Sequence, residues 1–291
     1  MSAHSEYYIP AGSAASPFTV HVTPESARWA ECGLIVAEFT APTDLTLETL
    51  DTEVMILPLA GEGSVRCDGR EFELSQRASV FDGPADMVYV GTGASYTLRG
   101  TGRFAICGAR ARRKLPNRRV PAADVAVELR GAGTCSRQVH NFGAAGTFEA
   151  DSLIACEVIT PGGNWSSYPA HKHDEDSPVE SQLEEIYYFE IDSGPDNSNG
   201  FGFHRVYGTQ DRPIDVLEEV RTGDVVLVPH GYHGPSVAAP GYHMYYLNVM
   251  AGSGRERAWK IVDDPAHAWL RSTWDGQQVD PRLPLHSPRG A

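Results

Sequence analysis

Glycine and proline interrupt this chain so often that long helices have little room to form. The 291 residues include 29 glycines and 20 prolines, and many of the segments between them are alternating or rich in β-branched residues. Short segments of this kind at close spacing indicate a β-sandwich or a β-barrel. We expect strands at Val54–Leu57, Ser79–Phe81, Met87–Val90, Phe104–Cys107, Leu153–Ile159, Glu185–Ile191, Phe201–Tyr207, Asp224–Val228 and Tyr242–Val249.

Helical periodicity, by contrast, is scarce. The sequence predicts short helices near Pro121–Leu129 and near Pro265–Ser272, and no long helix elsewhere. The chain as a whole is therefore predicted to be all-β.

The strand-turn-strand rhythm of the first half returns in the second half. Met55–Gly61 leads into Gly63–Gly69, and a comparable pattern later ends in Gly223–Pro229. Self-similarity of this kind suggests two related β-barrels in tandem. We expect an N-terminal domain at residues 1–130 and a C-terminal domain at residues 131–291.

A basic, proline-bearing stretch, Arg110–Ala122, is the expected linker, and the chain is expected to cross into the second unit near Gly131–His140. The rest of the chain is strongly acidic. A solvated linker or a salt-bridge surface between subunits therefore explains this stretch better than a nucleic-acid patch.

The charge balance limits the partners of the chain. Lysine and arginine number 24 against 38 aspartates and glutamates, a net charge of −14, which argues against binding to nucleic-acid phosphates. A small anionic substrate remains compatible, because a local arginine or metal can dominate a pocket. No segment approaches the ~18 apolar residues of a membrane span, and Met1–Tyr8 lacks the basic and apolar regions of a signal peptide. We expect a cytoplasmic protein without nucleic-acid or membrane partners, whose five cysteines are reduced and mostly buried.

Three histidines and a glutamate in the second half form the main candidate site. Alternate residues of a strand share a face, so His171 and His173 aim together while Lys172 aims away. Glu185 and His233 come from later predicted strands. Three imidazoles and one carboxylate can hold one divalent metal, whether Zn, Mn, Fe, Co or Ni, and leave positions open for a substrate.

This constellation resembles the two cupin motifs. It is most similar to the bicupin 5-deoxy-glucuronate isomerase family of inositol catabolism, and to the related 4-deoxy-threo-5-hexosulose-uronate ketol-isomerases. The resemblance is densest in the segments Pro169–Asp174, Glu184–Phe189, Gly202–Tyr207, Gly223–Pro229, Gly231–His233 and Gly241–Gly252. It implies two tandem cupin barrels (double-stranded β-helices, or jelly rolls), of which the first is degenerate and the second alone binds metal.

The sequence departs from the general cupin pattern at three places. An acidic insert, Asp174–Leu183, lengthens the gap from His173 to the glutamate; Asp192 stands where a glycine is usual; and His233 follows Gly231 one residue early.

Glu184 and Glu185 compete for the role of carboxylate ligand. They point to opposite faces of one strand, so one of them can face the metal. The phase of the motif favours Glu185.

The resemblance also implies a reaction, an aldose–ketose isomerisation of 5-deoxy-D-glucuronate to 5-dehydro-2-deoxy-D-gluconate. Candidate bases are Glu185, a metal-bound hydroxide, Tyr187 or Tyr246, and Tyr187 shares the face of Glu185. A guanidinium suits the carboxylate of a sugar-acid substrate. Arg205 is the first candidate, although an outward Arg205 in a surface salt bridge is nearly as well supported. Asn248 is expected to add a polar contact.

Two other classes of function fit the same barrel. A metal-dependent dioxygenase can use the same ligands around Fe(II), whereas the intact ligand set argues against a storage or sugar-binding bicupin. His204 and His243 lie in predicted strands and are expected to pack or to face solvent. Because edge strands of paired barrels associate, we also expect a homo-oligomer.

Overall fold

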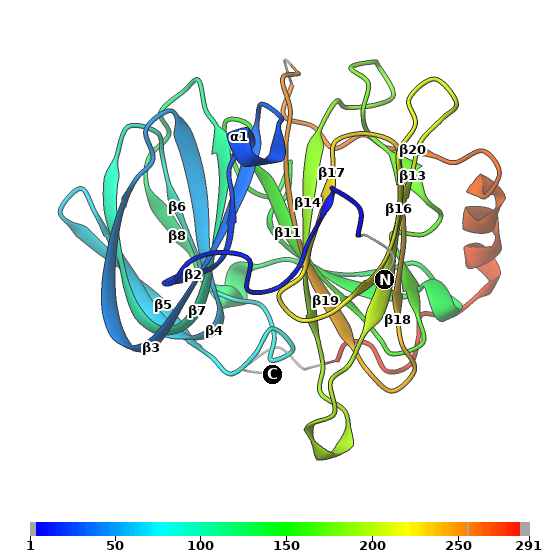
Figure 1. Cartoon of the computed structure of the whole chain (residues 1–291), viewed down its shortest axis with the longest axis horizontal. Coiled ribbons are helices and arrows are strands. Elements are labelled where there is room, and N and C mark those ends of the chain that lie inside the picture. Colours follow the sequence, from blue (N-terminus) through cyan, green and yellow to red (C-terminus); the bar gives the residue numbers. More distant parts are fainter. Residues whose placement is uncertain (1–3, 255, 286–291) are drawn as a thin grey trace.

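Two β-barrels lie side by side in the computed structural model, which describes residues 4–254 and 256–285 (Figure 1). The first half of the chain forms the N-terminal barrel and the second half forms most of the C-terminal barrel. The predicted all-β class with two tandem cupin barrels is confirmed. No helix in the described ranges is both long enough and apolar enough to cross a membrane.

The N-terminal barrel is built around three long, bent strands. Its strand order is β2-β3-β7-β4-β6-β8, with β5 paired to β4. Gly61 on β4 and Gly102 on β7 are register partners. Their φ angles are +105° and +114°, and a Cβ on either would clash with the backbone of the facing strand. Its elements are β2 (Phe18–Val22), α1 (Pro24–Ala27), β3 (Cys32–Glu48), β4 (Thr52–Cys67), β5 (Arg70–Arg77), β6 (Met87–Val90), β7 (Ser95–Arg110) and β8 (Arg118–Val120).

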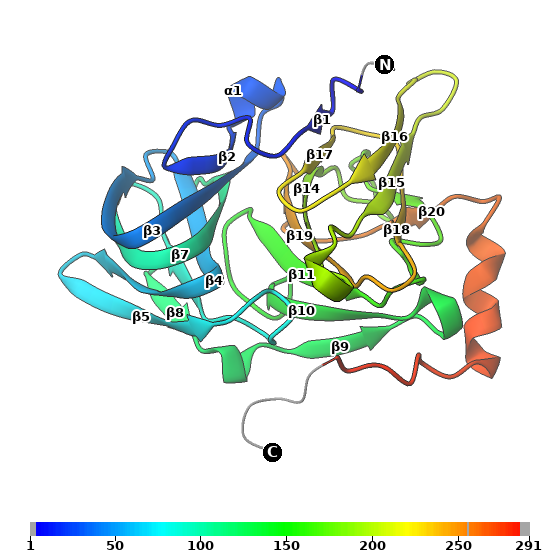
Figure 2. The same ribbon diagram turned by 60° about the horizontal axis from the view of Figure 1, so that its bottom comes forward.

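The C-terminal barrel consists of two facing sheets (Figure 2). The wide sheet has the order β1-β17-β14-β19-β11-β10-β9, and the narrow sheet has the order β16-β15-β18-β13-β20 with β12 on β18. The strands of the wide sheet are β1 (Tyr8–Ile9), β9 (Val127–Arg130), β10 (Arg137–Gly143), β11 (Ile154–Thr160), β14 (Glu184–Ile191), β17 (Val225–Val228) and β19 (Met244–Ala251). Those of the narrow sheet are β12 (Trp165–Ser166), β13 (His171–Lys172), β15 (Gly202–Tyr207), β16 (Asp215–Val220), β18 (Tyr232–Ala238) and β20 (Val262–Asp263).

The central strands of the wide sheet, β11, β14, β17 and β19, are buried on both faces, which explains their long apolar runs. One face packs on the N-terminal barrel, where Tyr188 and Tyr245 join a core with Met55 and Tyr89. The other face lines the interior of the C-terminal barrel, where Tyr187 and Tyr246 lie. Adjacent residues of one strand therefore serve two different cores.

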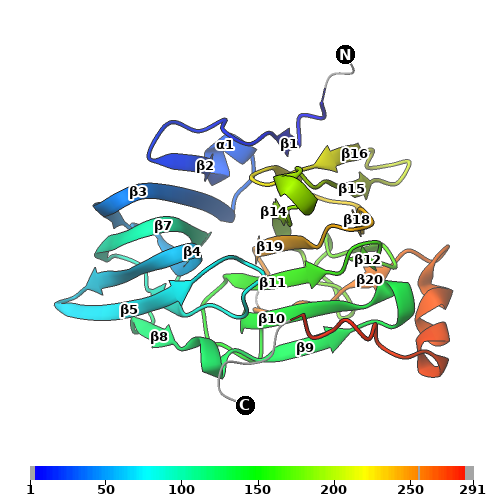
Figure 3. The same ribbon diagram turned by 90° about the horizontal axis from the view of Figure 1, so that it is seen from below.

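Two short strands within the expected N-terminal range, residues 1–130, join the sheet of the C-terminal barrel, and the boundaries 1–130 and 131–291 stay predictions. β1 pairs with β17, and β9 pairs with β10 (Figure 3), so β1 and β9 both belong to the wide sheet of the C-terminal barrel. The chain leaves the N-terminal sheet after β8 and enters the wide sheet at Val127. Sequence spacing could not reveal these additions, because pairing with a distant strand decides to which sheet a short strand belongs.

The predicted helix at Pro121–Leu129 is wrong. That segment holds the 3₁₀ turn Ala122–Asp124 and then β9. The second predicted helix is present in shifted form as the 3₁₀ helix Ala268–Gly276. Among the predicted strands, Ser79–Phe81 is a turn, because it packs around the side chain of Arg77, which donates to Val80 and Gly83.

Candidate metal centre

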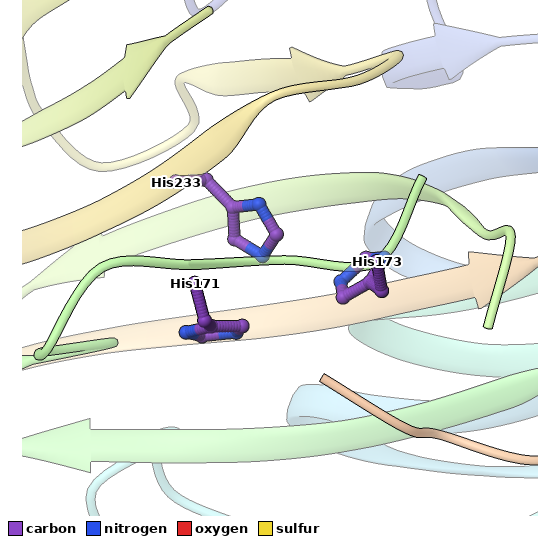
Figure 4. A group of neighbouring side chains, drawn as sticks. All are labelled: His171, His173 and His233. Carbon is purple, nitrogen blue, oxygen red and sulfur yellow. The ribbon is translucent and has the colours of Figure 1, made fainter. Parts of the chain in front are cut away.

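Three histidines converge inside the C-terminal barrel (Figure 4). His171 on β13 is the direct register partner of His233 on β18, and His173 follows two residues after His171. The potential ligand atoms of the three side chains all lie within 4.8 Å of one another. Lys172 points away and forms ion pairs with Asp174, Glu175 and Glu180, as the strand alternation predicts.

A backbone carbonyl faces the Nδ1 atom of each imidazole. Nδ1 of His171 lies 3.5 Å from the carbonyl oxygen of Pro169. Nδ1 of His173 lies 3.3 Å from the carbonyl oxygen of Leu183, and Nδ1 of His233 lies 3.2 Å from that of Gly231. A carbonyl can only accept, so each contact favours the tautomer that carries its proton on Nδ1. The lone pair of each Nε2 is then free, as in histidines that bind metal.

Glu185 adds a carboxylate to this group. Its Oε2 lies 3.0 Å from Nε2 of His173 and 3.1 Å from Nε2 of His233, and all three side chains are almost fully buried. Burial alone would raise the pKa of Glu185, but the imidazoles of His233 and His173 outweigh it and lower this pKa.

Glu184 faces the opposite side of β14. Its carboxylate accepts backbone N–H groups of Ala30, Glu31 and Cys32 in the N-terminal barrel. Between the two competing glutamates, Glu185 is the one that lies beside the histidines.

The acidic insert folds back beside the site. Glu180 accepts hydrogen bonds from Lys172 and from the backbone of Asp174, and Asp174 accepts the N–H of Gly231 at 2.9 Å. The insert thus connects the turn after His173 to the turn before His233. This contact gives the longer spacing between His173 and Glu185 a structural role.

The arrangement fits a cation. With its proton on Nδ1, an imidazole directs a lone pair toward the Glu185 carboxylate, and two lone pairs at about 3 Å repel unless a proton or a metal lies between them. One proton can satisfy one pair. Nε2 of His233 and Oε1 of Glu185 have no hydrogen-bond partner among the described residues. A metal ion, unlike one proton, could bind the three imidazoles and the carboxylate at the same time.

A cavity of about 260 Å³ opens beside the histidines. The hydroxyls of Tyr187 and Tyr246 lie 3.0 Å and 3.2 Å from Oγ of Ser167, and Nδ2 of Asn248 has no hydrogen-bond partner in the described ranges. The lining residues are Arg130, Arg137, Val139, Val158, Ser167, His171, Tyr187, Tyr246, Asn248, Trp259, Ile261 and Arg271.

Of the two expected placements of Arg205, the structure shows the outward one. Its guanidinium forms an ion pair with Asp215 and donates to the carbonyl of Val216 on the neighbouring strand, and it does not line the cavity. The alternation of β15 buries His204 and Val206 and turns Arg205 outward.

Arg130, Arg137 and Arg271 are the cavity arginines that the sequence did not reveal. Arg137 lies in the segment where the chain was expected to pass from the first domain to the second. The alternation Arg137-x-Val139 at the start of β10 was the sequence pattern that could have placed both side chains on one face.

Two further histidines do not join the metal group. His204 is buried, bonds to Oγ of Ser236 through Nδ1 at 2.7 Å and packs on Tyr187, as a packing role predicts. Burial lowers the pKa of His204 to about 3. His243 is half-buried and lies against the backbone N–H of Gly162.

Comparison with known proteins agrees with this geometry. A model of the KduI/IolB family matches residues 7–270. A 5-deoxy-glucuronate isomerase of Geobacillus thermodenitrificans is 44% identical over 256 residues, which is 86% of this chain and 90% of that protein. The enzyme of the same name from Bacillus subtilis strain 168 is 41% identical over 240 residues, 81% of this chain and 86% of that protein.

Solved structures show the same architecture. An IolB-like protein from Salmonella typhimurium LT2 superposes with a TM-score of 0.83 at 35% identity, and covers 91% of this chain and 99% of that one. The oxalate decarboxylase of Lactobacillus farciminis shares the fold alone, with a TM-score of 0.62 at 11% identity over 90% of each chain. The family match and the close relatives together show that this chain belongs to the KduI/IolB family.

Proposed function

We propose that this protein is a metal-dependent 5-deoxy-glucuronate isomerase, which converts 5-deoxy-D-glucuronate to 5-dehydro-2-deoxy-D-gluconate in myo-inositol breakdown. Relatives with this name are 41–44% identical over more than four fifths of the chain. The observation that most supports the activity is the convergence of three histidines and Glu185 beside a cavity that also contains arginines.

One divalent ion, Zn, Mn, Fe, Co or Ni, fits this set of nitrogen and oxygen donors. Nε2 of His171, His173 and His233 and the carboxylate of Glu185 would hold it. When bound, the ion acts as a Lewis acid on the substrate aldehyde and its neighbouring hydroxyl.

The reaction needs two proton shifts. One proton moves from C2 of the substrate to the aldehyde carbon, and one moves from the C2 hydroxyl to the aldehyde oxygen. We assign the carbon-to-carbon transfer to Oε1 of Glu185, because this buried oxygen has no hydrogen-bond partner in the part of the chain that the structure describes.

Tyr187 and Tyr246 are better suited to donate than to accept. Burial raises the pKa of both phenols above the ordinary value, so both carry their protons at neutral pH. Their hydroxyls meet at Ser167, which gives a donor pair to the substrate oxygens. Asn248 orients the sugar through its Nδ2, which has no hydrogen-bond partner among the residues that the structure describes.

An NMR assay with 5-deoxy-D-glucuronate tests the activity directly. We expect the ketose to form with metal-loaded protein, to stop forming after chelation and to return when a divalent metal is added back. His233→Ala should remove both the metal and the activity. The control His21→Ala, on an exposed position of β2, should retain both.

Full turnover by metal-free protein would overturn the metal-dependent mechanism. Consumption of oxygen without ketose formation would instead identify a dioxygenase.

A further inference from the structure

Arg137 is a buried cation with no partner of opposite charge in the part of the chain that the structure describes. Its side chain is 6% exposed, and no carboxylate in the described ranges lies within ion-pair distance of it. The hydrogen bond that the structure shows for it runs from Nη1 to the carbonyl of Cys135 at 3.1 Å. Taking a charge out of water costs several kcal/mol unless an opposite charge compensates it, so this position calls for an anion.

The two other cavity arginines are already neutralised. Arg130 donates through Nε and Nη2 to Glu128 at 3.0 Å and 2.7 Å. Arg271 forms a two-pronged pair with Asp263, with Nη2 at 2.7 Å from Oδ1. Because the guanidinium groups of Arg130 and Arg271 are each paired with a carboxylate, Arg137 is the one of the three described cavity arginines whose charge is uncompensated.

The cavity around Arg137 suits one carboxylate. Among the described residues, three arginines and no aspartate or glutamate line it. Val139 lies two residues after Arg137 on the same face of β10 and is the register partner of Val158. These apolar side chains exclude water, and an ion pair beside them is therefore strengthened.

The same cavity reaches the metal centre at His171. A ligand that fills it can therefore contact the histidine group and Arg137 together. Resting on the function proposed above, we infer that Arg137 binds the carboxylate of the sugar acid and thereby directs the aldehyde, at the other end of the molecule, toward the histidines.

The corresponding carboxamide of the substrate tests this role, because it has nearly the same shape but carries no charge and keeps one accepting oxygen in place of two. We expect the wild-type protein to prefer the acid over the amide by on the order of 100-fold in kcat/KM, as for loss of one buried charge pair. In Arg137→Gln this preference should fall to near unity, with the loss on the acid appearing mainly in KM. Arg137→Lys should retain part of the preference, because it keeps the charge but loses the planar fork.

Arg205→Gln is the matched control. It removes an outward guanidinium of the same barrel, so the acid-to-amide preference should stay within about twofold of wild type, as expected for an exposed ion pair. Calorimetric titration with the aldehyde-reduced acid gives a second measure that needs no turnover, and Arg137→Gln should weaken this binding as well.

The outcomes separate the subsite from the reaction. Wild-type protein that does not isomerise the acid would overturn the proposed function, while the titration would still report on Arg137. Wild-type protein that isomerises acid and amide equally well would overturn the role of Arg137, even if Arg137→Gln does not fold. An active Arg137→Gln variant with an unchanged preference would do the same.

Discussion

Glu184 and Glu185 are neighbours in sequence but serve opposite sides of strand β14. Glu184 accepts three backbone N–H groups from the N-terminal barrel, whereas Glu185 lies about 3 Å from two histidines inside the C-terminal barrel. The alternation of one strand thus divides two identical side chains between domain assembly and the metal site.

The two glutamates should respond differently to the same substitution. Glu185→Gln removes the charged ligand, so the metal content and the isomerase activity should both fall. Excess metal should not restore activity, because the proton acceptor is lost as well. Glu184→Gln should keep the metal and the activity but lower the free energy of unfolding by about 1 kcal/mol, since backbone N–H groups, two of them partly buried, lose a charged acceptor.

Metal analysis by mass spectrometry and denaturant unfolding of both variants check this division. Loss of metal from Glu184→Gln, with retention by Glu185→Gln, would reverse the assignment.

Retention of the metal should depend on pH. Burial alone would lower the pKa of His173, but its hydrogen bond and charge interaction with Glu185 raise this pKa above 6.5. The proton competes with the metal for Nε2, so affinity is full at high pH and falls as the pH drops through the raised pKa of His173. Dialysis between pH 8 and pH 5, followed by metal analysis, measures the loss. Equal metal content at both ends of this range would contradict the proton competition.

The all-β fold and the convergence of His171, His173 and His233 could be predicted from the sequence. His171, Lys172 and His173 obey strand alternation, and that rule needs only local sequence. The position of Arg137 was missed because the β10 segment looked like a crossing between domains. Its role depends on pairing with β11 and on the cavity that distant strands enclose.

The choice between the two placements of Arg205 could not be made from the sequence for a related reason. Composition can identify a strand, but its phase relative to the barrel interior depends on which residues the neighbouring strands bury. On β15 the inward positions are taken by His204 and Val206, which leaves Arg205 on the outside.

Tyrosines on adjacent positions provide a second matched comparison. Tyr187→Phe and Tyr246→Phe remove hydroxyls that face the cavity, and each should lower kcat by about 10²-fold, a typical contribution of one acid–base group. Tyr188→Phe and Tyr245→Phe remove hydroxyls bonded to Glu190 and Glu157 on the other face. These two should lower stability with little change in kcat. Steady-state kinetics and thermal unfolding of all four variants test the comparison, and a larger kcat loss in Tyr188→Phe than in Tyr187→Phe would contradict it.

The contact between the barrels contains a buried ion pair. Nη1 of Arg77 on β5 lies 2.6 Å from Oε1 of Glu157 on β11, and both side chains are almost fully buried. Tyr245 also donates to Glu157, and His140 lies 3.0 Å from its other oxygen. Arg77→Met leaves this carboxylate without its main counter-charge, and we expect a loss of about 3–5 kcal/mol in the free energy of unfolding.

The pH dependence of that loss identifies its cause. In the native protein burial would raise the pKa of Glu157, but Arg77 and then His140 outweigh burial and lower the pKa from 4.5 to about 2. This pair therefore stabilises the fold above pH 4.5, and its contribution disappears as the pH falls toward 2.

In Arg77→Met burial raises the pKa of Glu157, so the carboxyl takes up a proton in mild acid and its uncompensated charge vanishes. The stability difference between wild type and Arg77→Met should thus shrink as the pH falls from 7 to 4. Arg99→Met, which breaks an exposed pair with Asp44, should cost less than about 1 kcal/mol at either pH. A deficit in Arg77→Met that stays constant with pH would instead attribute the loss to packing, because packing does not respond to protonation of Glu157.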